Sequence, residues 1–180
     1  MGQCLKLCQC QRIIRVHLLG LKNVGKFTLT NKWRTGRILD KSNYTINFCE
    51  YDEFQYQNCQ FQIWSYPLVV EQYLFSVYWQ KGDAIVVLVD SSQLEQENYI
   101  QNYLHDNLFQ INEQNALKKI STLILANKKD ICKYNDSQIL DYIDINRFTD
   151  KVNYKLIYTN CFSGEGLYEA LEWLISNTVI

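Results

Sequence analysis

The sequence has almost no charge imbalance and no long apolar run. Its 180 residues include 18 Lys plus Arg and 19 Asp plus Glu, which gives a formal net charge of −1. No long-range attraction to nucleic acid follows from that balance. The longest purely apolar run, 84–89, is only six residues, whereas a membrane helix needs roughly 20. No apolar signal core follows Met1, so we expect a cytoplasmic protein that does not bind nucleic acid.

Paired cysteine motifs and prolines are also scarce. The seven cysteines are an odd number without a secretory signal, which favours reduced thiols over a disulfide framework. Cys8 and Cys10 are too close together for a Cys-x-x-Cys unit, and no second pair exists, so we expect no cysteine-based metal site. Pro67 is the only proline, and no repeat or linker interrupts the chain. The length therefore predicts one globular domain with a substantial core.

The chain does contain a regular alternation of strand-like and helix-like stretches. In chain order the expected elements are strand 12–19, helix 26–34, strands 45–54 and 59–64, helix 69–80, strand 84–89, helix 94–110, strands 120–126 and 154–159, and helix 167–176. This order predicts an α/β fold with a mostly parallel six-stranded sheet and helices on both faces. In such folds the ligand lies at the carboxyl ends of the strands.

A phosphate-binding loop is predicted between the first strand and the first helix. Gly20, Gly25 and Lys26 have the Gly-x-x-x-x-Gly-Lys spacing, in which backbone N–H groups cradle phosphates and the lysine neutralises their charge. The motif then requires Ser or Thr to coordinate Mg²⁺, but this chain has Phe27. The sequence therefore predicts that the loop binds phosphate, while the side chain at position 27 cannot coordinate Mg²⁺.

Two later loops have the chemistry to read a guanine base. Asn127, Lys128 and Asp130 follow an apolar strand, and a carboxylate at position 130 accepts hydrogen bonds from guanine N1–H and N2–H₂. Adenine lacks that donor pair, and an unpaired buried acceptor supports discrimination of about 10⁴. The loop 159–164, which contains Cys161, follows the last strand and closes over the base.

The order and spacing of these three loops resemble the ADP-ribosylation factor (Arf) and Arf-like branch of the small GTPases, over essentially the whole chain. The resemblance implies the P-loop small GTPase (G-domain) fold for residues 12–180 and GTP or GDP as ligand. It implies contact with the nucleotide for Gly20, Asn23, Gly25, Lys26, Thr28, Asn127, Lys128, Asp130 and Cys161.

The departures from the family concern the metal and the γ-phosphate. The family reads Trp-Asp-x-Gly-Gly-Gln at its second switch, where this chain has Trp64 followed by Ser65, and Leu68 and Val69 replace the γ-phosphate-sensing glycine and the water-orienting glutamine. Thr45 resembles the first-switch threonine that binds Mg²⁺. We therefore expect impaired Mg²⁺ binding, no catalytic residue and negligible hydrolysis.

The amino terminus resembles a lipid-anchor segment over residues 1–11. Gly2 lies in an N-myristoylation signal, although Lys6 stands where Ser or Thr is preferred. One myristoyl chain anchors only weakly, so Cys4, Cys8 and Cys10 are candidates for palmitoylation. We expect peripheral attachment to the cytosolic face of a membrane.

Two functions remain open at this point. The first is a membrane-associated, Arf-like protein that binds GTP or GDP with little or no hydrolysis and recruits a protein partner through its switch and interswitch face. The second is a pseudo-GTPase that serves as a structural subunit of a larger assembly, with a vestigial or empty nucleotide site.

Overall fold

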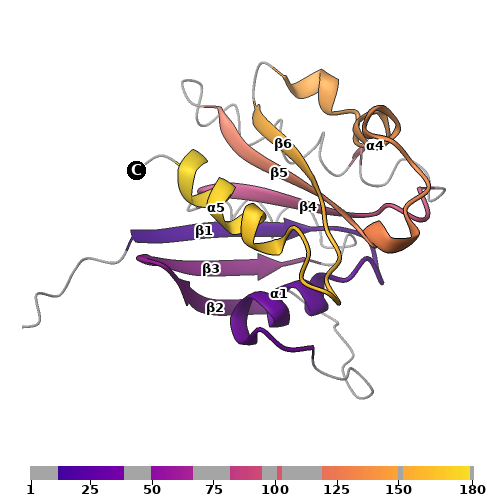
Figure 1. Cartoon of the computed structure of the whole chain (residues 1–180). Coiled ribbons are helices and arrows are strands. Elements are labelled where there is room, and N and C mark those ends of the chain that lie inside the picture. The colour runs from indigo at the N-terminus through magenta and orange to yellow at the C-terminus, as the bar shows by residue number, and fades with distance from the viewer. Residues whose placement is uncertain are drawn as a thin grey trace, which may run out of the picture.

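Six strands form a single sheet in the order β2-β3-β1-β4-β5-β6 (Figure 1). The computed structural model describes residues 12–38, 50–66, 82–94, 101–102, 119–149 and 152–178. The strands are β1 (Arg12–Leu19), β2 (Glu50–Tyr56), β3 (Cys59–Ser65), β4 (Ala84–Asp90), β5 (Ile120–Asn127) and β6 (Val152–Tyr158). All neighbouring pairs are parallel except β2 and β3, which form an antiparallel hairpin. The expected mostly parallel sheet of six strands is confirmed.

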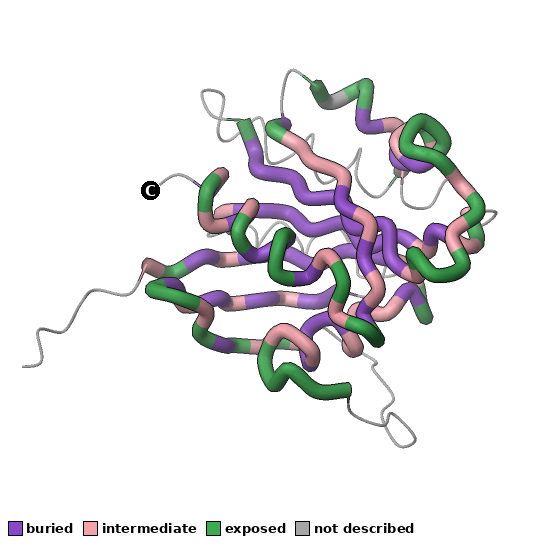
Figure 2. Tube along the Cα trace, in the orientation of Figure 1, coloured by how far each residue is buried: buried purple, intermediate pink, exposed green. Residues whose placement is uncertain are grey.

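Strands β4 and β5 are buried on both faces, as their largely apolar sequences predict. Every residue of β5 is buried, and in β4 only Asp90 at the carboxyl end is not. Strand β3 alternates buried and half-buried residues, which is the pattern of a strand with one better-covered face. Figure 2 shows the same gradient from the buried centre of the sheet to the exposed helices and loops.

Helices pack on the two faces of this sheet. Helix α1 (Lys26–Thr35) and α5 (Leu167–Asn177) contribute Leu29 and Leu174 to a core cluster that contains Val86, whereas α4 (Asp136–Ile143) contributes Ile139 to a second cluster that contains Val87. Since successive side chains of a strand point to opposite faces, Val86 and Val87 assign α1 and α5 to one face and α4 to the other. Helices on both faces are thereby confirmed.

Two short 3₁₀ helices and α4 were not expected from the sequence. They are η1 (Lys129–Ile131) and η2 (Ile145–Phe148). Helix α4 has only eight residues, but it begins with a capping box in which Asn135 and Gln138 exchange side-chain and backbone hydrogen bonds. The expected helices at 69–80 and 94–110 lie outside the described residues, apart from positions 94, 101 and 102. Within the described part of the chain, no helix is long and apolar enough to cross a bilayer.

The start of β1 is tied to the end of α5. Arg12 Nη1 donates to the carbonyl oxygen of Ile175 at 2.8 Å, and Nη2 donates to the hydroxyl of Thr178 at 2.7 Å and to its carbonyl oxygen. A guanidinium at the last carbonyls of a helix also complements the helix dipole.

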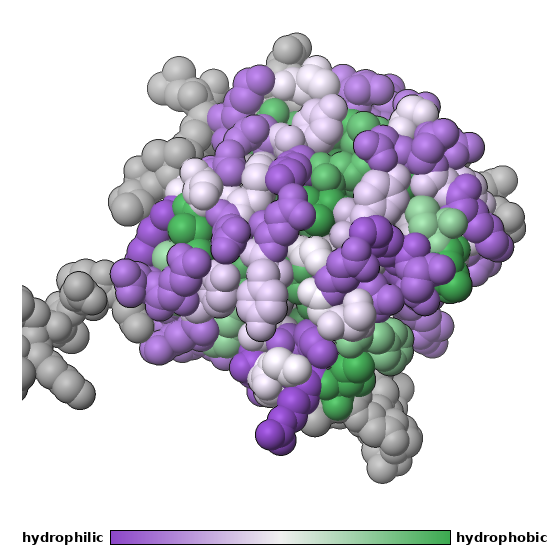
Figure 3. Space-filling model, in the orientation of Figure 1, coloured by the Kyte–Doolittle hydropathy of each residue, from purple (hydrophilic) through white to green (hydrophobic). Residues whose placement is uncertain are grey.

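On the face seen in Figure 3, apolar residues form separate small patches among hydrophilic ones, so this view contains no broad apolar surface.

Candidate nucleotide site

The phosphate loop, residues 20–25, connects β1 to α1 and depends on glycine at both ends. Gly20 has φ 159° and Gly25 has φ 107°. A Cβ on Gly20 would lie 2.6 Å from the carbonyl oxygen of Leu88, and a Cβ on Gly25 would lie 2.6 Å from Asn127 Nδ2. Both the backbone conformation and the close packing therefore exclude larger residues.

The start of α1 presents backbone donors beside a lysine. Gly25 provides no side-chain cap, no acidic residue occupies the first turn, and the first helical hydrogen bond runs from Leu29 N–H to the Gly25 carbonyl at 2.9 Å. The positive end of the helix dipole and a neighbouring lysine thus favour an anion at this helix start. Lys26 Nζ donates to the carbonyl oxygens of Gly20 at 2.6 Å and Leu21 at 2.9 Å, which holds its ammonium group over the loop.

Asn127 joins the phosphate loop to the two base-reading loops, which we define as residues 127–130 and 159–164. Its side chain is buried, with 3% exposed. Nδ2 donates to the Val24 carbonyl at 2.7 Å, and Oδ1 accepts from the backbone N–H of Cys161 at 3.1 Å. One amide therefore connects loops that follow β1, β5 and β6, all at the carboxyl edge of the sheet.

Lys128 is anchored to the end of the neighbouring strand. Its backbone is left-handed, with φ 64°, and its Nζ forms an ion pair with Asp90 Oδ2. Asp90 Oδ1 also accepts from the backbone N–H of Ser92 at 2.9 Å. Burial would raise the pKa of Asp90, but the hydrogen bonds from Lys128 and Ser92 outweigh it and hold that pKa below its usual value. The Lys128 stem is consequently held between the ends of β5 and β4.

Asp130 is exposed on η1 and faces the second base-reading loop. Its Oδ1 accepts from Asn160 Nδ2 at 2.9 Å. The two loops are also joined by the Lys129 N–H, which donates to the Thr159 carbonyl at 3.0 Å, and Lys129 forms an ion pair with Glu165, the residue after the second loop. The carboxylate is thus held in a framework of contacts between the loops.

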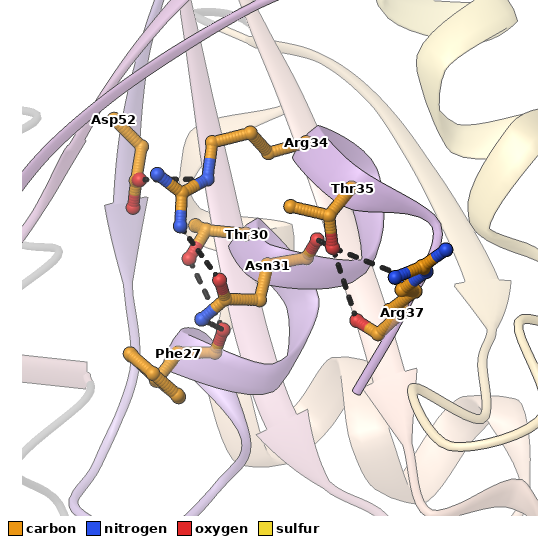
Figure 4. Close-up of polar contacts among 7 residues, drawn as sticks. All are labelled: Phe27, Thr30, Asn31, Arg34, Thr35, Arg37 and Asp52. Carbon is orange, nitrogen blue, oxygen red and sulfur yellow. Dashed lines mark hydrogen bonds and ion pairs between the residues drawn. The ribbon is translucent and has the colours of Figure 1, made fainter. Parts of the chain in front are cut away.

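The metal side of the site, which we define as Phe27 and Ser65, has different chemistry. The phenyl group of Phe27 offers no oxygen ligand, and its carbonyl oxygen accepts from Thr30 Oγ1 at 3.2 Å and Asn31 Nδ2 at 3.1 Å. Figure 4 shows the Phe27 side chain directed away from that network. Ser65 is buried at the end of β3. Across the described ranges, no three His, Cys, Asp or Glu side chains gather in a metal-binding group. Impaired Mg²⁺ binding stays a prediction that depends on the missing hydroxyl at position 27 and the missing carboxylate at position 65.

The same network links α1 to the edge strand. Arg34 Nη2 donates to Asn31 Oδ1 at 2.8 Å, and Arg34 Nε lies 3.7 Å from Asp52 Oδ1 on β2. Asn31 is buried, and Figure 4 shows it between Phe27 and Arg34. Hydrogen bonds of this kind satisfy an amide that would otherwise be costly to bury.

An aromatic row, consisting of Tyr51, Trp64, His17 and Tyr66, crosses β2, β3 and β1 to the first residue after β3. The neighbouring ring centroids lie 5.2, 5.5 and 5.6 Å apart. His17 Nδ1 and the Tyr66 hydroxyl are 3.0 Å apart, and Tyr66 N–H donates to the Leu18 carbonyl at 3.1 Å. Burial lowers the pKa of His17 to about 3, so this ring is neutral at physiological pH. The row fixes the start of the altered second-switch segment.

Comparison with known proteins agrees with this arrangement. The model of the ADP-ribosylation factor family matches residues 2–178. The chain belongs to this family. ADP-ribosylation factor 3 of Arabidopsis thaliana is 29% identical over 168 residues, which cover 92% of this chain and 87% of the relative. ADP-ribosylation factor F of Dictyostelium discoideum is 27% identical over 174 residues, which cover 96% and 89%.

A solved structure shows the same fold. The small GTPase Arl6 (BBS3) of Trypanosoma brucei, determined with the nucleotide analogue GppNp, superposes with a TM-score of 0.73 and 21% identity. The match covers 92% of this chain and 97% of that one. The resemblance to the Arf family and the small GTPase fold are therefore confirmed, and the family's fold implies a site for GTP or GDP.

The structure brings together the Arf-type residues predicted to contact the nucleotide. They lie in the phosphate loop, the first turn of α1 and the base-reading loops: Gly20, Asn23, Gly25, Lys26, Thr28, Asn127, Lys128, Asp130 and Cys161. Their contact with a nucleotide stays a prediction. Of the other Arf-type candidates, Ser65 is described, whereas Thr45, Leu68, Val69, Gly2, Cys4, Cys8 and Cys10 lie outside the described residues.

Two residues of the site were missed by sequence reasoning. Asp90 holds Lys128, and Asn160 holds Asp130, across sequence separations of 38 and 30 residues. The signal for Asp90 was its place at the carboxyl end of an apolar strand. The signal for Asn160 was the Asn-x-x-Ser turn composition, since asparagine side chains accept hydrogen bonds from backbone N–H groups two residues ahead.

Proposed function

We propose that this Arf-family protein binds GDP or GTP with little dependence on Mg²⁺, hydrolyses GTP negligibly and acts by recruiting a protein partner at a membrane. The bridge formed by Asn127 carries the proposal, because it holds the phosphate loop and both base-reading loops in one arrangement. A buried amide with two well-formed hydrogen bonds preorganises a pocket before the ligand arrives. The replacement of a hydroxyl residue by Phe27 does not alter the phosphate loop glycines or the base-reading loops that Asn127 connects.

Weak hydrolysis follows from the chemistry of phosphoryl transfer. The reaction depends on positioning the attacking water and on neutralising charge at the γ-phosphate. Phe27 and Ser65 replace a hydroxyl and a carboxylate on the metal side, while Leu68 and Val69 replace the sensing glycine and the water-orienting glutamine. Binding without turnover is the expected behaviour.

Membrane attachment is proposed through Gly2 and the cysteines at positions 4, 8 and 10. A myristoyl group with at least one palmitoyl group supplies the two signals that stable anchoring requires. We propose that the interswitch hairpin, β2 with β3, then presents its outer face to a protein partner. A Gly2→Ala variant should move from the membrane fraction to the soluble fraction of cells, and full retention on membranes would contradict the proposed anchor.

A second candidate is the structural subunit with an empty nucleotide site. It is favoured by the Lys26 ammonium group, which already has the Gly20 and Leu21 carbonyls as acceptors within the loop. It is also favoured by the aromatic row, which fixes the start of the second-switch segment. Both features are compatible with a domain that keeps one conformation whether or not a nucleotide is bound.

The nucleotide content of the purified protein separates these functions. Freshly purified protein is denatured and its supernatant analysed by chromatography, with and without chelator during purification. GDP or GTP at close to one equivalent, unchanged by chelator, supports the proposed function. Lys26→Ala, which removes the loop cation, should reduce that content. Wild-type protein without nucleotide that also fails to bind added GDP would support the structural subunit.

A further inference from the structure

We propose that Asn160 is a positioning residue that orients Asp130 toward the base and thereby sets the preference of the site for guanine over adenine nucleotides. This inference rests on the proposed function, since it specifies how that nucleotide is selected. The observation behind it is the 2.9 Å hydrogen bond from Asn160 Nδ2 to Asp130 Oδ1.

Asn160 itself is held by its own loop. Its Oδ1 accepts from the backbone N–H groups of Phe162 at 2.8 Å and Ser163 at 3.1 Å. Its backbone N–H donates to the Glu165 carbonyl at 3.1 Å, and its carbonyl accepts from Gly164 N–H at 2.8 Å. Because both backbone groups and the amide oxygen are engaged inside the loop, the amide NH₂ group has a fixed direction. That direction is toward Asp130.

Asp130 needs such a partner because it is exposed. Among the described residues, Asn160 provides the only side-chain hydrogen bond to its carboxylate. An exposed carboxylate rotates freely, and fixing it on binding costs side-chain entropy. A hydrogen bond already made at Oδ1 removes part of that cost, while a second lone pair on Oδ1 and both on Oδ2 remain for the ligand.

Guanine makes a stringent demand on this geometry. Its N1–H and N2–H₂ groups point in parallel toward one carboxylate, so both oxygens must lie in the plane of the base. Hypoxanthine keeps N1–H but lacks the amino group, and adenine presents neither donor at that edge. A correctly oriented carboxylate therefore favours guanine most, hypoxanthine less and adenine not at all.

The substitution Asn160→Asp tests the orientation of the Asp130 carboxylate while keeping the hydrogen bonds within the loop. An aspartate keeps an oxygen that accepts from the Phe162 and Ser163 N–H groups, but it replaces the donor to Asp130 with a like charge. We expect the ratio of the ADP to the GDP dissociation constant to fall about tenfold, the size of one hydrogen bond to a charged group. Because ADP and GDP carry the same phosphates, the ratio cancels the effect of the added charge on phosphate binding.

Two further variants complete the test. Asn160→Ala removes both the donor to Asp130 and the acceptor within the loop. Its ratio of the ADP to the GDP dissociation constant provides the test if the Asn160→Asp protein folds poorly. Asn153→Ala is the matched control, because Asn153 is an exposed asparagine at the other end of β6 whose Nδ2 donates to Asn177 Oδ1 at 2.9 Å. The control should leave all three nucleotide affinities within about twofold of wild type.

The outcomes distinguish this inference from the function on which it rests. The proposal is supported if the Asn160 variants lower the ratio of the ADP to the GDP dissociation constant and weaken IDP binding less than GDP binding. Asn160 would then position Asp130. Equal losses for all three nucleotides, or an unchanged ratio, would overturn it while leaving guanine-nucleotide binding intact. Wild-type protein that binds no nucleotide in the same titration would overturn both.

Discussion

Around the candidate site, the base-reading loops are tied together by side chains, whereas the metal side presents a phenyl ring and a buried hydroxyl. Asn127, Asp130 and Asn160 each hydrogen-bond to a group on another loop, but Phe27 and Ser65 offer no equivalent set of ligands. The proposed function assigns recognition of the base to the first set of residues and activation of the terminal phosphate to the second. If it is correct, a chain can lose the second set and keep the first.

The largest expected effect comes from removing the carboxylate that reads the base. In Asp130→Ala the preference for GDP over ADP should fall by about 10³ to 10⁴, because the bidentate acceptor for N1–H and N2–H₂ is gone. Competition titrations against a fluorescent guanine nucleotide measure it. Asp141→Ala, which removes an exposed acid on α4, is the control. A variant that still prefers GDP strongly would show that the base is read elsewhere.

Removing the bridge between the loops should lower stability. Asn127→Ala leaves the Val24 carbonyl and the Cys161 N–H without their partner in a buried site, at a cost of about 3 kcal/mol in the free energy of unfolding. Urea denaturation of protein without added nucleotide gives this value, with Asn153→Ala as the surface control. A loss below about 1 kcal/mol would mean that water or local rearrangement replaces the bridge.

Rebuilding the metal side should make nucleotide binding depend on magnesium. In a double variant, Phe27→Thr with Ser65→Asp, chelator should weaken GDP affinity by about a hundredfold, since a divalent ion contributes several kcal/mol at phosphate oxygens. Wild type should change by less than about twofold. Phe27→Leu, which adds no oxygen, should behave as wild type does. A strong chelator effect on wild-type affinity would contradict the proposed independence from Mg²⁺.

The last expected effect, which vanishes above pH 6.5, concerns pH and the aromatic row. Burial lowers the pKa of His17 from 6.5 to about 3, so the unfolded chain binds a proton below pH 6.5 that the folded chain does not. The stability due to His17 is complete above pH 6.5 and is lost as the pH falls toward 3, by up to about 1.4 kcal/mol per pH unit. Urea unfolding at pH 7.5, 5.5 and 4.5 should show a flatter dependence for His17→Gln than for wild type. Parallel curves for the two proteins would refute this assignment.

The sequence predicts the framework of the site better than its fine contacts. The apolar runs of β4 and β5 and the glycine spacing around Lys26 are local signals, and the structure agrees with both. Helix α4 was missed because its eight residues fall short of the about 10 to 12 over which a helical pattern is usually recognised. Asp90 and Asn160 were missed for a different reason, because each acts on a partner that is brought near only by the folded sheet.

The attachment of Arg12 to the last turn of α5 has a mechanical consequence. Tension applied through residues that precede β1 would be carried first by the guanidinium contacts with Ile175 and Thr178. These contacts lie at the amino end of the parallel strands, while the phosphate loop lies at the opposite end. A tether attached before Arg12 would therefore join the domain at the edge of the sheet opposite the phosphate loop.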